Sequence, residues 1–249
     1  MSGLYRFKLT LEYDGGNFHG WQLQENAPSI QEELEKAVFN YCQTDCRFYA
    51  AGRTDAGVHA LGMVVHVDIP RNEKPYKLME ALNYHLKGVP ISVLDSEAVT
   101  EDFHARFSAK KRYYRYHIIN RRAKLSLMQG KAWHVKQPLD ADAMHDAAQV
   151  LVGKHDFTTF RSVQCQSKSP LKTLEKLDVS RDGENIYIDT TAISYLHHQV
   201  RSMVGCLYYV GRGKWSKDDL QKALKAADRN ALGYNAPPDG LYFMKVDYE

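Results

Sequence analysis

The chain has 249 residues, of which 44% are apolar and 25% charged, and its formal net charge is +3. These values are typical of a globular protein with a sizeable core and argue against a disordered or fibrous chain. No apolar run reaches the ~20 residues that cross a bilayer, and residues 1–6 lack a secretion signal, so we expect a cytoplasmic protein without membrane contact. The four cysteines lack the spacing of a zinc site, and we expect free thiols.

Periodicity predicts six elements in the first half of the chain. Tyr5–Tyr13 alternates apolar and polar side chains as a half-buried strand does. Ser29 and Glu32 have the spacing of a capping box and predict the start of a helix. In chain order we expect a strand, a helix, two strands, a helix and a strand, at 5–13, 29–41, 48–51, 63–69, 79–86 and 91–99.

The second half repeats this order with one extra helix. Asp140 is expected to cap a helix that Gly153 ends, and Asp182-Gly183 to turn a strand pair. The expected elements are a strand at 112–119, the helix at 140–153, strands at 173–179 and 185–192, helices at 196–207 and 216–229, and a strand at 241–248.

Each half therefore reads β-α-β-β-α-β, the ferredoxin-like order, which forms antiparallel sheets with helices on one face. The predicted fold class is α+β with two duplicated units of this kind. We place the N-terminal domain at 1–105 and the C-terminal domain at 106–249, with the boundary next to a strongly basic stretch.

Charge is distributed unevenly along the chain. Residues 103–139 contain ten Lys and Arg and no Asp or Glu, whereas the remainder carries 23 basic and 30 acidic residues. Tyr113, Tyr114 and Tyr116 lie among these cations. Cations bind phosphates and flat rings stack on bases, so this combination favours single-stranded or looped nucleic acid as the partner. The alternative is a solvated basic face that binds no partner. The candidate RNA contacts in this stretch are Arg106, Lys110, Lys111, Arg112, Tyr114 and Arg121.

The segment 51–62 is punctuated by three glycines and carries Arg53 and Asp55 two residues apart. In an extended or irregular loop these two side chains can point the same way, and an adjacent cation keeps a carboxylate ionised. An ionised carboxylate in a cleft acts as a nucleophile or a base. The alternative is that Asp55-Ala56-Gly57 is only a turn.

A second candidate is the segment His197–Arg201. Helical geometry predicts that Arg201 and His197 share an edge of a helix that can reach a cleft. The adjacent histidines lack the His-Glu-x-x-His spacing of a zinc helix, so we expect no metal site.

Gly52-Arg53-Thr54-Asp55-Ala56-Gly57-Val58-His59-Ala60 resembles the signature of the TruA family of tRNA pseudouridine synthases. The resemblance runs almost from end to end. Other matching motifs are Tyr13-Asp14-Gly15, Gly20-Trp21-Gln22, Phe103-His104-Ala105-Arg106-Phe107-Ser108, Tyr114-Arg115-Tyr116, His155-Asp156-Phe157, His197-His198-x-Val200-Arg201 and Gly240-Leu241-Tyr242. Leu23 and Gln199 depart from the residues common in the family.

The resemblance implies an isomerase that needs no cofactor and no metal. Asp55 is implied as the catalytic aspartate, with Arg53 pairing with it and holding the target nucleotide out of the helix. Tyr114 is implied to stack on the base and assist proton removal from C5, and Arg201 to pair with Asp55 from the other domain. His59, within the signature, is a further candidate for substrate contact.

The implied substrate is uridine at positions 38, 39 and 40 of the tRNA anticodon arm, bound in a central RNA-binding cleft by a homodimer. A uridine within a stem must be flipped out, which a basic, tyrosine-rich cleft suits. Two alternatives stay open, a non-catalytic RNA-binding protein and a metal-dependent RNA hydrolase that uses Asp55 and the histidines.

Overall fold

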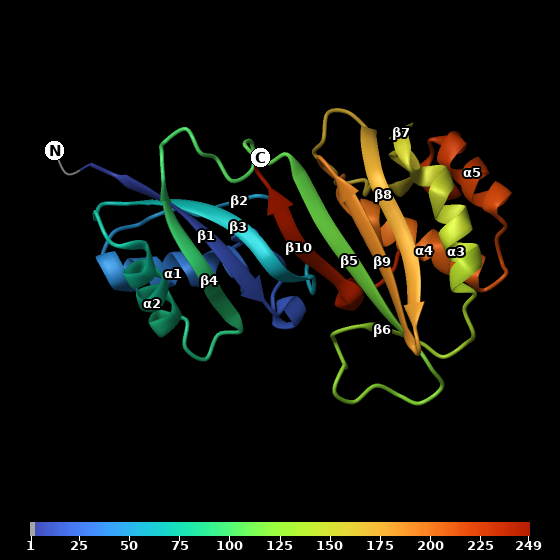
Figure 1. Ribbon diagram of the computed structural model, residues 1–249, viewed down its shortest axis with the longest axis horizontal. Helices are drawn as coiled ribbons and strands as arrows, with labels where there is room; N and C mark the ends of the chain where they lie inside the picture. The colour runs from blue at the N-terminus through green and yellow to red at the C-terminus, as the bar shows by residue number, and fades with distance from the viewer. Residues whose placement is uncertain (1–2) are drawn as a thin grey trace. The chain divides into compact units, whose positions relative to one another are not determined.

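The computed structural model describes residues 3–249 and has an α+β fold with mostly antiparallel strands (Figure 1). It divides into two compact units, Met1–Lys110 with Tyr242–Glu249 (unit 1) and Lys111–Leu241 (unit 2). The first boundary between the units falls after Lys110, whereas the expected domain boundary follows residue 105. The C-terminal segment, however, belongs to unit 1 and not to the second half of the chain.

Unit 1 has the predicted β-α-β-β-α-β order. Its elements are β1 (Tyr5–Tyr13), α1 (Ile30–Cys42), β2 (Tyr49–Ala50), β3 (His59–Ile69), α2 (Pro75–His85) and β4 (Ile91–Val99), followed at the chain end by β10 (Leu241–Asp247). β1 lies between β4 and β3 and is antiparallel to both. β2 pairs antiparallel with β3, and β10 pairs with β3 in parallel at Tyr242 and Phe243. This parallel pairing explains why the last strand joins unit 1.

The core of unit 1 follows from the alternation of β1. Phe7, Leu9 and Leu11 are buried on one face, together with Leu34 of α1 and Leu82 of α2. Burying each such side chain contributes roughly 1.5 to 3 kcal/mol. Residues of opposite charge pair between neighbouring strands, as in the salt bridge of Arg6 with Asp68 at 2.7 Å and that of Lys8 with Glu97 at 2.5 Å.

Unit 2 contains the remaining strands and helices. Its elements are β5 (Lys111–Asn120), β6 (Trp133–Val135), α3 (Ala141–Ala148), β7 (Gly153–Asp156), β8 (Leu171–Asp182), β9 (Asn185–Ala192), α4 (Gln199–Gly211) and α5 (Lys217–Ala226). The strands β5, β9, β8 and β7 follow one another in the sheet and pair antiparallel, and β6 pairs with β5 in parallel. The predicted strand pair that turns at Asp182-Gly183 is confirmed.

Three predicted helix ends in unit 2 were wrong. α3 ends at Ala148 and a 3-10 turn follows it, so Gly153, with φ +108°, begins β7. α4 begins at Gln199 and not at Leu196, because His198 has a left-handed backbone with φ +66°. α5 ends before Ala227, which is also left-handed. Periodicity alone extended each helix, because it does not reveal where the backbone leaves the helical region.

Within residues 3–249, no helix combines the length and the apolar character that crossing a membrane requires. All four cysteines are free thiols in this structure. The Sγ atoms of Cys42 and Cys46 lie 3.9 Å apart in the core of unit 1.

Candidate active-site loop

The loop between β2 and β3 carries Asp55 at the first position of a tight turn. The Val58 N–H donates to the Asp55 carbonyl oxygen at 3.1 Å. Gly57, the third residue of this turn, has φ +79°, which glycine adopts without strain. The backbone of Asp55-Ala56-Gly57 therefore does form a turn. The turn does not decide which role the Asp55 side chain has.

Thr54, which precedes Asp55, is held from two directions. The hydroxyl groups of Tyr13 and Thr54 share a buried hydrogen bond of 2.8 Å. The Trp21 N–H donates to the Thr54 carbonyl oxygen at 3.0 Å. Gly20 must lack a side chain because a Cβ there would lie 2.7 Å from the same oxygen. These contacts bring the Tyr13 and Gly20-Trp21 motifs to a loop that is distant from both in the sequence.

The other end of the loop rests on Asp14, Gly15 and His59. A Cβ on Gly15 would lie 2.0 Å from the Val58 carbonyl oxygen, so only glycine fits. The Gly15 N–H donates to His59 Nδ1 at 3.1 Å, and the Asp14 carboxylate lies 3.0 Å from the same nitrogen. His59 is buried and stacks on Tyr242, with ring centroids 4.8 Å apart. His59 thus holds this end of the loop in place through its contacts with Gly15 and Tyr242.

Tyr242 keeps its proton in this setting. Burial, with a smaller contribution from the charge of Asp14, raises the pKa of the Tyr242 hydroxyl to about 12. The Tyr242 ring that stacks on His59 is therefore neutral at neutral pH.

Arg53 and Asp55 flank Thr54 along the chain. Thr54 is buried, whereas Arg53 is exposed and Asp55 half-buried. In an extended stretch, successive side chains point to opposite sides, so residues two apart share a side. Arg53 and Asp55 are thus both more accessible than Thr54, the residue between them.

In unit 2, Tyr114 lies on β5 and is buried. Its ring meets that of Tyr195 edge to face, with centroids 5.0 Å apart. The Tyr195 hydroxyl shares a hydrogen bond of 3.1 Å with Thr190 Oγ1 on the neighbouring strand β9. The Tyr114 ring is thus held in one orientation by packing on a rigid sheet.

Arg201 lies in the first turn of α4. Its Nε donates to the Ala236 carbonyl oxygen at 2.9 Å, and the Ala236 N–H donates back to the Arg201 carbonyl oxygen at 3.0 Å. His197 and His198 precede α4, so the prediction that His197 shares a helix edge with Arg201 was wrong. The His197 carbonyl oxygen instead accepts the Ser162 N–H at 2.8 Å.

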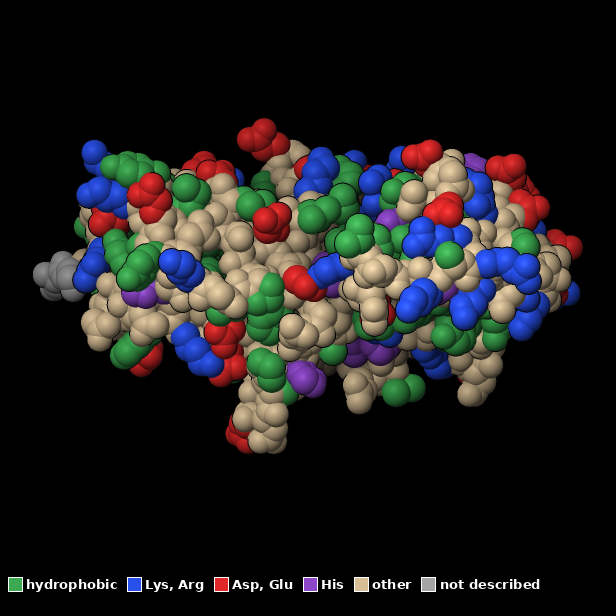
Figure 2. All heavy atoms as spheres, turned by 90° about the horizontal axis from the view of Figure 1, so that it is seen from below, with side chains coloured by type: hydrophobic (Ala, Val, Ile, Leu, Met, Phe, Trp, Pro, Cys, Tyr) green, Lys and Arg blue, Asp and Glu red, His purple; other side chains and the backbone are tan. Residues whose placement is uncertain are grey.

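Several cations of the basic stretch have partners that the sequence did not indicate. Lys111 pairs with Glu175 at 2.7 Å, and Arg121 pairs with Glu184 at 3.0 Å. The buried Arg112 donates to the Ile193 carbonyl oxygen. On the face of unit 2 drawn in Figure 2, Asp and Glu side chains accordingly lie among the clusters of Lys and Arg.

Arg106 and Lys110, at the start of the stretch, belong to unit 1 and are exposed. The Lys110 N–H donates to the Asp247 carbonyl oxygen at 2.8 Å. The basic stretch is therefore divided between the two units.

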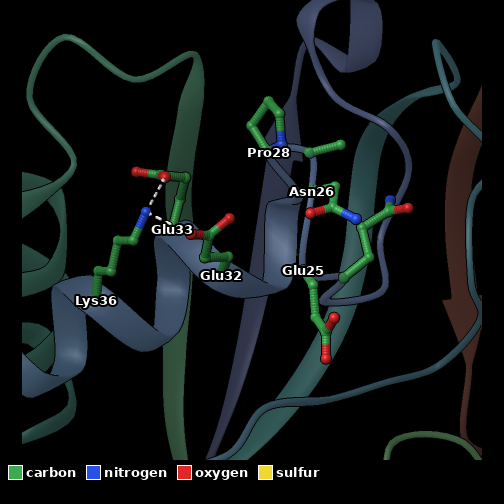
Figure 3. A pocket seen from close by; sticks show the side chains of 8 residues that line it. Glu25, Asn26, Pro28, Glu32, Glu33 and Lys36 are labelled. Atoms are coloured by element: carbon green, nitrogen blue, oxygen red, sulfur yellow. Dashed lines mark hydrogen bonds and ion pairs between the residues drawn. The ribbon is translucent and has the colours of Figure 1, made fainter.

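A shallow pocket of about 310 Å³ lies next to the start of α1 in unit 1 (Figure 3). Its lining includes Glu25, Glu32 and Glu33, and Lys36 pairs with the last two at 2.7 and 3.0 Å. The excess of carboxylates disfavours a polyanion at this place.

The chain belongs to a family of RNA-modifying isomerases, the tRNA pseudouridine synthases. The family model described as tRNA pseudouridine synthase matches residues 10–108 and 147–249. The matched segments contain Arg53, Asp55 and Arg201, whereas Tyr114 lies in the interval between them.

Close relatives carry the name tRNA pseudouridine synthase A. The protein of that name from Bradyrhizobium sp. (strain BTAi1 / ATCC BAA-1182) is 59% identical over 98% of this chain and 99% of its own length. That from Rhodopseudomonas palustris (strain ATCC BAA-98 / CGA009) is 58% identical over 100% of both chains. A crystal structure of aminoacylhistidine dipeptidase from Vibrio alginolyticus covers 100% of this chain and 42% of its own, but its 12% identity and TM-score of 0.25 are too low to inform the fold.

Proposed function

We propose that this tRNA pseudouridine synthase isomerises uridine at positions 38, 39 and 40 of the tRNA anticodon arm. The relatives named tRNA pseudouridine synthase A, similar over nearly the whole chain, support this choice of substrate. In the reaction, the bond from ribose C1′ to uracil N1 breaks and a bond from C1′ to C5 forms. The C5 proton leaves and N1 gains a proton, so reactant and product have the same atoms and no cofactor is consumed.

Asp55 is assigned to the bond-making or bond-breaking step. The observation that carries this assignment is the loop itself, in which Thr54 is anchored on one side of Asp55. On the other side the Gly57 N–H donates to the Phe18 carbonyl oxygen at 3.2 Å. A carboxylate held on a preorganised loop needs little rearrangement before it attacks the uridine or promotes glycosidic cleavage. Arg53, two residues before it, is assigned to holding the flipped nucleotide and keeping Asp55 ionised.

Tyr114 and Arg201 are assigned to the same nucleotide from unit 2. The packing of Tyr114 on Tyr195 suits a ring that stacks on the base, and its hydroxyl is assigned to proton removal from C5. The Nε bond of Arg201 to Ala236 holds the side chain that we assign as the ion-pair partner of Asp55.

The remaining substrate contacts differ in how well the structure supports them. Arg106 and Lys110 are exposed and suit phosphate contacts. Lys111 and Arg121 are ion-paired with glutamates, so a phosphate would compete with those carboxylates. Arg112 and His59 are buried, and we assign both to supporting roles beside the RNA and not to direct phosphate contacts. We further propose that the enzyme acts as a homodimer in the cytoplasm.

The test is Asp55→Asn, which keeps the size of the side chain but removes its charge and nucleophilicity. We expect tritium release from tRNA labelled at uridine C5 to be undetectable, because no second nucleophile is assigned. Folding and tRNA binding should persist, because a polar turn tolerates this change within about 0.5 kcal/mol and affinity comes mainly from phosphates.

A matched control is Asp45→Asn, a change of the same kind at an exposed aspartate outside the loop, which should leave turnover unchanged. A tenth or more of wild-type turnover in Asp55→Asn, a loss of only about 1.4 kcal/mol, would show that Asp55 merely positions the substrate. Wild-type protein that binds tRNA without releasing tritium would favour a non-catalytic RNA-binding protein, and chain cleavage would favour a hydrolase.

A further inference from the structure

Unit 1 carries a cluster of aromatic rings that the proposed mechanism does not use. His66 lies on β3 between Val65 and Val67, and strand alternation places its side chain on the face opposite to theirs. Tyr49, its cross-strand partner on β2, stacks on the His66 ring with centroids 4.9 Å apart and planes 15° from parallel. The His104 ring meets His66 edge to face at 4.6 Å.

Phe107 extends this cluster into solvent. Its ring packs against His104 with centroids 4.4 Å apart, yet 75% of the residue is exposed. Tyr49, whose ring centroid lies 5.8 Å from that of His104, is 45% exposed. A single exposed phenylalanine needs no explanation, but two exposed rings joined through a histidine form a continuous aromatic surface.

Hydrogen bonds hold this surface in one conformation. His104 Nδ1 accepts the N–H of Arg106 at 3.1 Å and that of Phe107 at 3.4 Å, and the His104 N–H donates to Ser108 Oγ at 3.0 Å. The Ala105 N–H donates to the Nδ1 atom of the buried His66 at 3.2 Å. The segment 104–108 is therefore fixed on the sheet before any ligand binds, which lowers the entropy cost of binding.

The charge beside the cluster is positive. The Arg106 guanidinium carbon lies 5.6 Å from the centroid of the Phe107 ring. The segment 103–111 has no acidic residue and also contains the exposed Lys110. A flat ring next to an arginine matches the two parts of an unpaired nucleotide, its base and its phosphate.

We propose that Phe107, with His104 and Tyr49 behind it, stacks on an unpaired base of the tRNA, while Arg106 contacts a phosphate beside that base. This site is separate from the nucleotide assigned to Asp55 and serves to bind the RNA and not to perform the chemistry. The inference rests on the proposed function, since it requires tRNA as the substrate.

The test compares Phe107→Leu, which keeps an apolar side chain but removes the ring, with Phe107→Trp, which keeps a ring. Tyr84→Leu on α2 is the matched control, because it removes another strongly exposed ring of unit 1, 73% exposed. Equilibrium binding of tRNA and single-turnover tritium release at saturating enzyme are measured for each protein.

We expect Phe107→Leu to raise the Kd for tRNA at least about five-fold, because base stacking on one ring supplies roughly that factor or more. Its single-turnover rate at saturation should stay within two-fold of wild type, and Phe107→Trp and Tyr84→Leu should bind like wild type. The unfolding temperature of Phe107→Leu should change by no more than roughly 2 °C, because the residue is exposed.

An unchanged Kd in Phe107→Leu with an active wild-type enzyme would overturn this inference and leave the proposed function intact. An altered oligomeric state with an unchanged Kd would also overturn it, and would assign the surface to a second copy of the chain. A wild-type protein that forms no pseudouridine would instead contradict the proposed function.

Discussion

Thr54 connects the proposed catalytic residue to the rest of unit 1. Its hydroxyl and its carbonyl oxygen are both hydrogen-bonded, to Tyr13 and to Trp21, at the position directly before Asp55. The motifs around Tyr13 and Trp21 carry no assigned chemical role in the sequence. Their contacts with Thr54 show that they hold the loop, a role that their spacing along the chain does not reveal.

A double-mutant cycle tests the Tyr13–Thr54 hydrogen bond. Tyr13→Phe and Thr54→Val each remove one hydroxyl, and we expect each to reduce the free energy of unfolding by about 1 to 2 kcal/mol. The double variant should lose little more than either single variant, because both remove the same bond. Chemical denaturation measures the free energies, and Thr54→Ser is the control that keeps the hydroxyl. Strictly additive losses would mean that the two hydroxyls act independently.

At Tyr114 a substitution separates stacking from proton transfer. Tyr114→Phe keeps the ring that packs on Tyr195 and removes only the hydroxyl. We expect tRNA affinity near that of wild type and a single-turnover rate reduced by a factor of about 100 or more, the range that general acid–base catalysis supplies. Rapid-quench measurement of tritium release checks the rate. Equal rates for both proteins would restrict Tyr114 to stacking.

At the scale of elements, the segment 103–108 packs on the sheet of unit 1. The pKa values of His66 on the sheet and of His104 in the segment are both lowered there. Burial, with smaller effects of the nearby His104 and Arg6, lowers the pKa of His66 to about 4. Burial also lowers the pKa of His104, again with a smaller effect of Arg6. Both rings are consequently neutral at neutral pH. This agrees with the hydrogen bonds, because an Nδ1 atom that accepts a backbone N–H carries no proton of its own.

These pKa shifts predict acid destabilisation of unit 1. Between pH 6.5, the ordinary histidine value, and about pH 4, the unfolded chain binds a proton at His66 that the folded chain does not. Stability should therefore decrease as the pH falls through this window, by about 1 to 3 kcal/mol in total for this residue.

Thermal unfolding of wild type and His66→Asn across this window measures the effect. Asn does not titrate and its side-chain oxygen accepts the Ala105 N–H, so its profile should be flatter than that of wild type. His19→Asn, a change of the same kind at an exposed histidine, is the control. Parallel pH profiles for wild type and His66→Asn would contradict the assignment.

For the whole molecule, the formal charge of the basic stretch overstates what it offers to RNA. Glutamates from β8 and from the turn before β9 pair with Lys111 and Arg121, whereas Lys110 lies in unit 1. The three cations should therefore differ in how strongly they contribute to tRNA binding.

Salt titrations of tRNA binding test this difference. Removal of one cation that binds a phosphate lowers the slope of log K against log salt by roughly 0.7 to 0.9. We expect a change of this size in Lys110→Ala and smaller changes in Lys111→Ala and Arg121→Ala, whose side chains already have carboxylate partners. Lys225→Ala, at an exposed lysine on α5, is the control. Identical slopes for wild type and Lys110→Ala would mean that this cation faces solvent and not RNA.

The sequence by itself determined the β-α-β-β-α-β order of unit 1, the limits of β1, β4 and β9, and the family, because periodicity and short motifs depend on neighbouring residues. It did not predict the short strands β6 and β7. Only the tertiary structure decided that Tyr242 and Phe243 pair with β3, that Glu175 neutralises Lys111, and that Tyr13 holds Thr54. The physical reason is that strand pairing, ion pairs and buried hydrogen bonds join groups that are distant in the chain. A local sequence pattern therefore specifies which charged, polar and apolar groups a segment contains. Which group each of them contacts is determined only when distant segments come together in the fold.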